Sequence, residues 1–145
     1  MEKYYLVKAR YEKVLDSGAT KTVTEQFLVK TSSFGRAEEI ILKELGQYVK
    51  TEINITSVAI TKYADVSLSG DGENVESFFK CKVLICTLDT RGNEKNTPIE
   101  LLVDAKTSLG ARKATGKYMA SKYISSYNIE LIKETKIIQV VNDEQ

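Results

Sequence analysis

The stretch YYLVKARYEKVLDSGATKTVTEQFLVKT, residues 4–31, decides the fold of this chain. Over residues 4–15 apolar and polar side chains alternate, which is typical of a strand with one buried face. Residues 16–19 then supply a turn in which Gly18 is free to take a positive φ angle, and residues 22–31 again have strand character. The stretch therefore predicts an antiparallel hairpin.

A helix and a third strand follow this hairpin. Ser33 is a suitable N-cap for a helix that runs to about residue 49, because its hydroxyl can accept a hydrogen bond from the first turn. Apolar residues recur along that helix at spacings of three and four; they are Phe34, Ala37, Ile41, Leu45 and Tyr48. A run rich in β-branched residues, from about 53 to 66, predicts the third strand.

The same ββαβ pattern occurs twice. Sliding the sequence by 74 positions brings Gly18 onto Gly92 and Thr61 onto Thr135. Around the second helix a shift of 75 superposes Ser33 on Ser108, which predicts one inserted residue before that helix. In the second copy we expect strands over 78–88, 99–106 and 129–141, a turn at 90–93 and a helix over about 108–123.

These observations predict an α+β fold built by internal duplication of a ββαβ unit. We expect a single domain over residues 1–145, made of repeats 3–66 and 77–141 and joined by a polar connector, 67–76. Each repeat, at roughly 65 residues, is marginal as an independent core. Two helices packed on about six strands with pseudo-two-fold symmetry is the simplest arrangement.

Composition excludes several classes of protein. The 145 residues carry 21 basic and 20 acidic side chains, and 42% of them are hydrophobic, as in an ordinary globular chain. No stretch reaches the ~18 to 20 apolar residues of a membrane-spanning helix. The first residues lead directly into the strand pattern without the features of a signal peptide. We therefore expect a cytoplasmic protein with no membrane association.

The residue inventory also argues against an enzyme. The absence of histidine removes Ser-His and Cys-His nucleophile pairs and all imidazole metal ligands. Residues 110–117 resemble a nucleotide-binding P-loop, but five residues instead of four separate the two glycines, and Tyr118 follows Lys117 where Ser or Thr is needed. We expect no catalytic residue, no metal and no cofactor.

Two thiols and three acidic residues have structural explanations. Cys81 and Cys86 lie five positions apart on one predicted strand, too far for a disulfide, and Cys81 is expected to be buried. Asp71, Glu73 and Glu76 cluster in the connector and are expected to form a solvated acidic linker. Neither group predicts a site.

The chain resembles an uncharacterised family of short duplicated proteins from Bacteroidales and their phages, classified as a domain of unknown function. The matching motifs are Tyr11-Glu12-Lys13, Val23-Thr24-Glu25, Phe27-Leu28-Val29 and Ser33-Phe34 in the first copy, and Leu88-Asp89 with Leu101-Leu102-Val103 in the second. The resemblance covers nearly the whole chain, and its motifs are structural. It implies a bacterial or phage protein and provides no catalytic residues.

Functional candidates come from the strand face that should lie opposite the helices. If Tyr5, Val7, Ala9 and Tyr11 face the helix, as do Phe79, Cys81, Val83 and Ile85 in the second copy, the other face carries aromatic and cationic side chains in both copies. Aromatic rings beside cations suit unstacked bases and phosphates. The second helix adds cations in a stretch without acidic residues. The candidate binding residues are Tyr4, Lys8, Arg10, Phe78, Lys82, Arg112, Lys113 and Lys117.

Three functions are compatible with this pattern. The first is a non-enzymatic binding protein of phage or mobile-element context that contacts single-stranded nucleic acid through these residues. The second is a phage protein that sequesters a small anionic, nucleotide-like ligand, which fits the low net charge of +1. The third is a structural or protein-interaction module. An open, half-apolar sheet face would also favour homo-oligomers.

Overall fold

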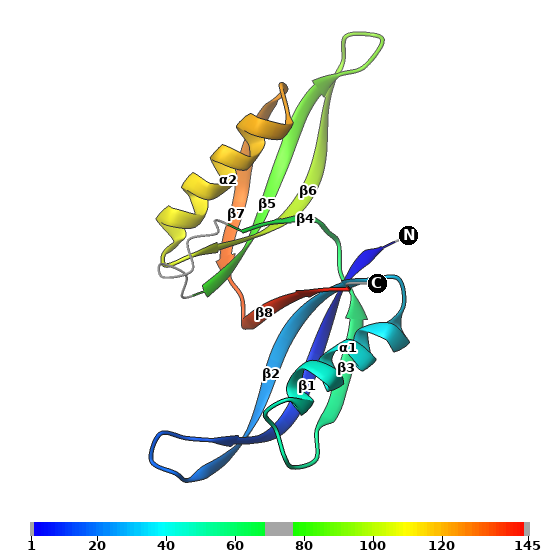
Figure 1. Ribbon diagram of the computed structural model, residues 1–145. Helices are drawn as coiled ribbons and strands as arrows, with labels where there is room; N and C mark the ends of the chain where they lie inside the picture. Colours follow the sequence, from blue (N-terminus) through cyan, green and yellow to red (C-terminus); the bar gives the residue numbers. More distant parts are fainter. Residues whose placement is uncertain (1, 69–76, 144–145) are drawn as a thin grey trace. The chain divides into compact units, whose positions relative to one another are not determined.

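The computed structural model describes residues 2–68 and 77–143, and within these ranges the chain forms two helices and eight strands (Figure 1). In chain order the elements are β1 (Lys3–Val14), β2 (Thr20–Thr31), α1 (Phe34–Gly46), β3 (Asn54–Ile60), β4 (Tyr63–Ser67), β5 (Ser77–Leu88), β6 (Glu94–Ala105), α2 (Ser108–Lys122), β7 (Ser126–Glu134) and β8 (Ile137–Asn142). The expected α+β class is confirmed. Asp71, Glu73 and Glu76 lie outside the described residues.

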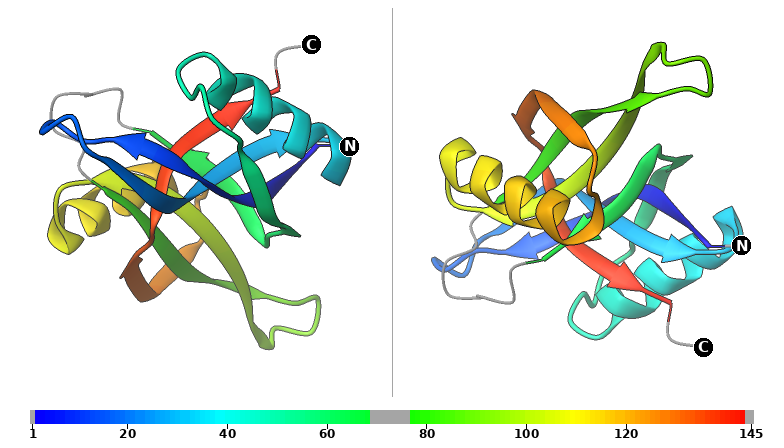
Figure 2. Two further views of the ribbon diagram at one scale, coloured as in Figure 1. Left: turned by 90° about the horizontal axis from the view of Figure 1, so that it is seen from below. Right: turned by 90° about the horizontal axis from the view of Figure 1, so that it is seen from above.

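The strands form two four-stranded sheets, in the orders β3-β1-β2-β8 and β4-β6-β5-β7. The chain divides into two compact units, each with one sheet and one helix. Unit 1 consists of residues 1–61 and 137–145, and unit 2 consists of residues 62–136. Figures 1 and 2 show each helix lying along one face of the sheet of its own unit.

Each unit contains one strand from the other half of the sequence. β4 follows β3 in the chain, but it pairs in parallel with β6 of unit 2. β8 follows β7, but it pairs in parallel with β2 of unit 1. The third strand expected in each half is therefore two strands in different sheets, and the expected total of about six strands is wrong.

The chain leaves the first sheet at Thr61 and the second at Thr135. The backbone amide and the hydroxyl of Thr61 both donate to the carbonyl oxygen of Tyr4, at 2.9 and 2.8 Å. Thr135 makes the same two bonds to the carbonyl of Phe78, at 2.9 and 2.8 Å. These bonds end the antiparallel pairing of β3 with β1 and of β7 with β5, and the next residues enter the other sheet.

The helix-facing side of each hairpin forms a hydrophobic core, as the alternation predicts. Tyr5, Val7, Ala9 and Tyr11 are buried in unit 1, and Phe79, Cys81, Val83 and Ile85 are buried in unit 2. The turn prediction is also confirmed, because Gly18 and Gly92 take φ angles of 88° and 81°. Both cysteines are free thiols. Among the described helices, none combines the length and apolar character needed to cross a membrane.

Ser33 caps α1 as expected, and Thr107 caps α2, which begins at Ser108 as expected. Ser33 accepts a hydrogen bond from the amide of Arg36 at 3.1 Å, and Thr107 accepts the equivalent bond from Gly110. The buried helical residues are Ala37, Ile41 and Leu45 in α1, and Ala111, Thr115 and Met119 in α2. Each buried residue of α2 lies 74 positions after its counterpart in α1, so the inserted residue predicted before the second helix is wrong. Phe34 and Tyr48, also predicted for the apolar helix face, are exposed.

Candidate functional site

The sheet face opposite the helix is less open than the sequence predicts. Tyr4 lies on this face of β1 but is only 8% exposed, and the Nζ atom of Lys30 lies 5.7 Å from the centroid of its ring. Leu28, on the same face of β2, is fully buried. The expectation that Tyr4 offers an open ring for a base is therefore wrong, because the ring is already covered.

The other predicted residues of the two hairpins have different surroundings. In unit 1, Lys8 is half-buried and Arg10 is exposed. In unit 2, Phe78 and Lys82 are half-buried, and the Nζ atom of Lys82 lies 3.6 Å from a carboxylate oxygen of Glu130. An ion pair of this kind already neutralises Lys82, so it is a weaker anion ligand than an unpaired lysine.

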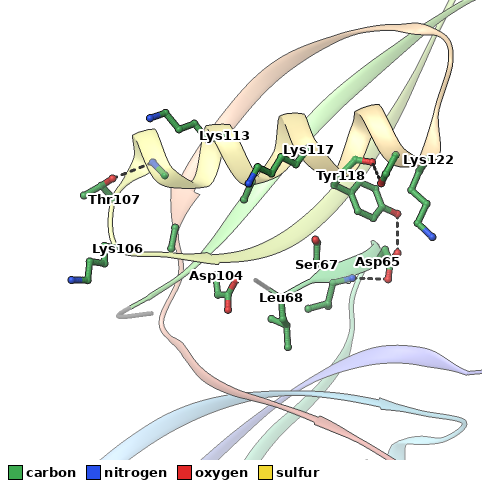
Figure 3. Close-up of a pocket in the computed structure, with 15 residues that line it drawn as sticks. Asp65, Ser67, Leu68, Asp104, Lys106, Thr107, Lys113, Lys117, Tyr118 and Lys122 are labelled. Carbon is green, nitrogen blue, oxygen red and sulfur yellow. Dashed lines mark hydrogen bonds between the residues drawn. The ribbon is translucent and has the colours of Figure 1, made fainter. Parts of the chain in front are cut away.

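The three helical candidates, Arg112, Lys113 and Lys117, are brought together on the exposed side of α2. Two of them, Lys113 and Lys117, lie one turn apart and line a cleft of about 830 Å³ between α2 and β4 (Figure 3). Lys106, just before the helix, and Lys122, its last residue, line the same cleft. Four lysines therefore contribute to the lining of one cleft of unit 2, and Figure 3 shows the side chain of Lys113 directed away from β4.

The opposite wall of the cleft comes from β4, which carries Asp65, Val66 and Ser67. One end of the cleft is bridged by a hydrogen bond of 2.8 Å, in which the hydroxyl of Tyr118 donates to Oδ2 of Asp65. The other oxygen of Asp65 accepts the backbone amide of Val66 at 2.8 Å. Figure 3 shows Tyr118 pointing across the cleft toward Asp65. These bonds hold β4 and α2 together at this end.

The cleft lysines differ electrostatically from the lysines of the sheet. Lys80 and Lys82 form ion pairs with Glu100 and Glu130, at 2.7 and 3.6 Å. Within residues 2–68 and 77–143, no carboxylate lies at ion-pair distance from any of the four cleft lysines. The carboxylates of Asp65 and Asp104 also line the cleft, so the four lysines leave an excess of positive charge, which favours a bound anion.

Small side chains keep the cleft open. Gly110, Ala114 and Ser121 lie on the flank of α2 that faces it. In unit 1 the corresponding groove lies between α1 and β8, and the residues 74 positions earlier are Arg36, Ile40 and Gln47. There two nitrogens of the Arg36 guanidinium donate to the two carboxylate oxygens of Asp143, each at 3.2 Å. The side-chain amide of Gln139 donates to the carboxylate of Glu44, also at 3.2 Å. Side chains thus bridge the groove of unit 1 at two places, whereas in unit 2 the bond between Tyr118 and Asp65 bridges one end of the cleft.

Sequence reasoning proposed Lys113 and Lys117 as binding residues and noted Lys122 and Tyr118 in the same stretch without acidic residues, but it missed Lys106 and Asp65. That stretch extends over residues 105–129, so the same signal covers Lys106. Asp65 could not be found in this way, because it reaches α2 only through the pairing of β4 with β6.

The model of one protein family, described as a domain of unknown function (DUF4494), matches residues 3–143. The chain belongs to the DUF4494 family. This confirms the resemblance to an uncharacterised domain family, while the bacterial or phage origin stays a prediction. No curated protein matches the chain in sequence. The description of DUF4494 states no activity.

Proposed function

We propose that this protein is a non-enzymatic binding protein that holds a small phosphorylated ligand, of nucleotide size, in the cleft between α2 and β4. The observation that carries the proposal is the set of four lysines around this cleft, none of which is paired with a carboxylate among the described residues. Charge-assisted hydrogen bonds from lysine to phosphate are among the stronger polar contacts in proteins.

The size and lining of the cleft support the same ligand class. Its volume of about 830 Å³ falls in the range of roughly 300 to 1,000 Å³ that is usual for small-molecule sites. Besides the lysines, the lining includes the aromatic ring of Tyr118 and the hydroxyls of Ser67 and Ser121. A nucleotide needs cations for its phosphates, an aromatic or apolar surface for its base and polar groups for its sugar. The cleft offers all three.

The proposal is tested by isothermal titration calorimetry with single mononucleotides, inorganic phosphate and a single-stranded oligonucleotide. We expect stoichiometric binding of at least one mononucleotide and weaker binding of the oligonucleotide. The double variant Lys113→Ala/Lys117→Ala should weaken that binding about tenfold, or about 1.4 kcal/mol.

The control is Lys95→Ala/Lys133→Ala, which removes two exposed lysines of the same unit that do not line the cleft. It should bind like the unaltered protein. Equal losses in both double variants would show a general effect of charge and would contradict a site in the cleft, as would the absence of binding by any mononucleotide.

A second candidate is single-stranded nucleic acid, and a specific observation favours it. Lys113 lines not only the cleft but also a groove on the other flank of α2, next to β7, where Arg112 lies. Exposed cations thus continue from one flank of the helix to the other, as a phosphodiester backbone would require. Under this candidate the oligonucleotide binds more tightly than any mononucleotide, and its affinity falls steeply with salt.

We also propose that the two units derive from duplication of a ββαβ segment. The supporting observations share one spacing of 74 positions: the positive-φ glycines Gly18 and Gly92, the threonines Thr61 and Thr135 with their paired bonds, and the buried residues of the two helices. The groove beside the helix is larger in unit 2, at about 830 Å³, than in unit 1, at about 510 Å³, so we expect the ligand to bind in unit 2.

A further inference from the structure

We infer that unit 1 contains a second small-molecule site, for a ligand with an apolar body and one N–H or O–H donor. The site is a pocket of about 400 Å³ between the turn-side end of the β1–β2 hairpin and the segment after α1. It is built entirely from residues of unit 1, so it does not depend on the function proposed for the cleft of unit 2.

Three polar side chains of the lining, Tyr11, Lys13 and Glu25, contact one another. The hydroxyl of Tyr11 donates to Oε1 of Glu25, and the Nζ atom of Lys13 lies 3.3 Å from Oε2 of the same carboxylate. The side chain of Glu25 is only 14% exposed, although it is charged. Desolvation and the neighbouring Glu25 carboxylate raise the pKa of Tyr11, so its phenol remains a hydrogen-bond donor at neutral pH.

Unit 2 shows that packing does not require these polar groups. Both hairpins have strands of 12 residues with the same antiparallel register. The positions of Tyr11 and Glu25 are occupied in unit 2 by Ile85 and Ile99, both of which pack in the hydrophobic core. Holding a carboxylate at a largely buried position costs free energy unless it is well paired. In unit 1 Tyr11 and Lys13 pair with this carboxylate, at positions where unit 2 has two isoleucines.

The rest of the lining combines exposed apolar side chains with the polar side chains of Glu12, Thr20, Lys50 and Thr51. Val14, Tyr48 and Ile138 line it, and they are 70%, 59% and 47% exposed. A small apolar molecule would remove this surface from water, which is favourable. A carboxylate can accept about four hydrogen bonds, and Tyr11 and Lys13 account for two at Glu25. A donor on the ligand would use the remaining capacity.

The test uses three probes of the same shape with different polar ends: 2-phenylethylamine, 2-phenylethanol and ethylbenzene. Binding is followed by protein-observed NMR at millimolar probe concentration. We expect the amine and the alcohol to shift the backbone signals of Glu25, Tyr48 and Val49, and ethylbenzene to bind at least about fivefold more weakly. No shift at these residues with any probe, or equal binding of ethylbenzene, would overturn the proposal.

The matched variant is Tyr11→Ile/Glu25→Ile, which copies the pair found in unit 2. It should fold, as judged by circular dichroism, and bind the amine and the alcohol no better than ethylbenzene. A variant that keeps the preference for donors would contradict the site. If this variant fails to fold, Glu25→Gln replaces it, because glutamine keeps the shape of the side chain and one acceptor oxygen. Glu25→Gln should weaken binding of the amine more than binding of the alcohol. Equal losses of binding for the two probes would contradict a role of Glu25.

A final control separates the two proposals. Lys113→Ala/Lys117→Ala alters the cleft of unit 2 and leaves every residue of the unit 1 pocket in place. Binding of 2-phenylethylamine should be the same in this variant as in the unaltered protein. Loss of that binding would show that the amine occupies the cleft of unit 2 and would overturn the pocket in unit 1.

Discussion

Arg36 and Asp143 form a two-pronged ion pair across 107 positions of sequence. The Nε atom of Arg36 lies 3.2 Å from Oδ2 of Asp143, and Nη2 lies 3.2 Å from Oδ1. The hydroxyl of Thr31 donates to the same carboxylate at 2.7 Å, and the backbone amide of Asp143 donates to the carbonyl of Lys30 at 3.0 Å. The residue that follows β8 is thereby attached to both β2 and α1.

This ion pair predicts a pH-dependent stability. Hydrogen bonds from Arg36 and Thr31 lower the pKa of Asp143 below its ordinary value of 3.8. A lowered pKa stabilises the folded state above pH 3.8, and this stabilisation is lost as the pH falls through the lower folded value. Asp143→Asn should therefore lower the melting temperature at neutral pH, and the difference should shrink in acid. A difference that is constant across pH would contradict the assignment.

The exchange of strands predicts that the two halves hold together after cleavage of the chain between them. A protease site introduced within residues 69–76 would leave β4 on the first fragment and β8 on the second. Each fragment would still provide a strand to the sheet of the other half. We expect the two fragments to elute together in native size-exclusion chromatography and to separate only in denaturant. Separation in native buffer would contradict the observed pairing.

Removal of one hydroxyl tests the closed end of the cleft. Tyr118→Phe deletes the hydrogen bond to Asp65 and leaves the aromatic ring in place. Loss of a hydrogen bond to a carboxylate should cost about 1 to 2 kcal/mol in the free energy of unfolding, measured by urea denaturation. Tyr123→Phe is the control, because Tyr123 packs on the same core and no hydrogen bond of its hydroxyl is observed within the described part of the chain. Equal losses of unfolding free energy in Tyr118→Phe and Tyr123→Phe would show that the hydrogen bond to Asp65 does not stabilise the fold.

The two thiols should react at different rates. Cys81 is fully buried, and burial raises the pKa of its thiol, whereas Cys86 is half-buried on the same strand. A thiolate-specific reagent such as Ellman's reagent should label one thiol of the folded protein quickly, and the other only after unfolding. The fast phase should disappear in Cys86→Ser. Two thiols of equal reactivity would contradict the burial of Cys81.

Part of the candidate site follows from local sequence. Lys113 and Lys117 lie four positions apart on a predicted helix, so they share a face in any fold that forms the helix. Asp65 is different, because 53 positions separate it from Tyr118, its hydrogen-bond partner. No spacing rule connects such residues. The expectation of an open ring at Tyr4 was wrong for a related reason: alternation assigns a residue to a face but does not show what covers that face.

The sequence by itself determined the two hairpins, the two helices and the helix-facing side of β1 and β5. Alternation, turn glycines and capping residues act over a few positions, so they could be interpreted without the fold. Only the tertiary structure decided that β4 and β8 join the sheets of the opposite halves. Residues 53–66 form a strand-like run with no glycine or proline at Thr61 and Lys62 to mark a break. After this break β4 pairs with β6, and after the equivalent break at Thr135 and Lys136 β8 pairs with β2; both partners are distant in sequence.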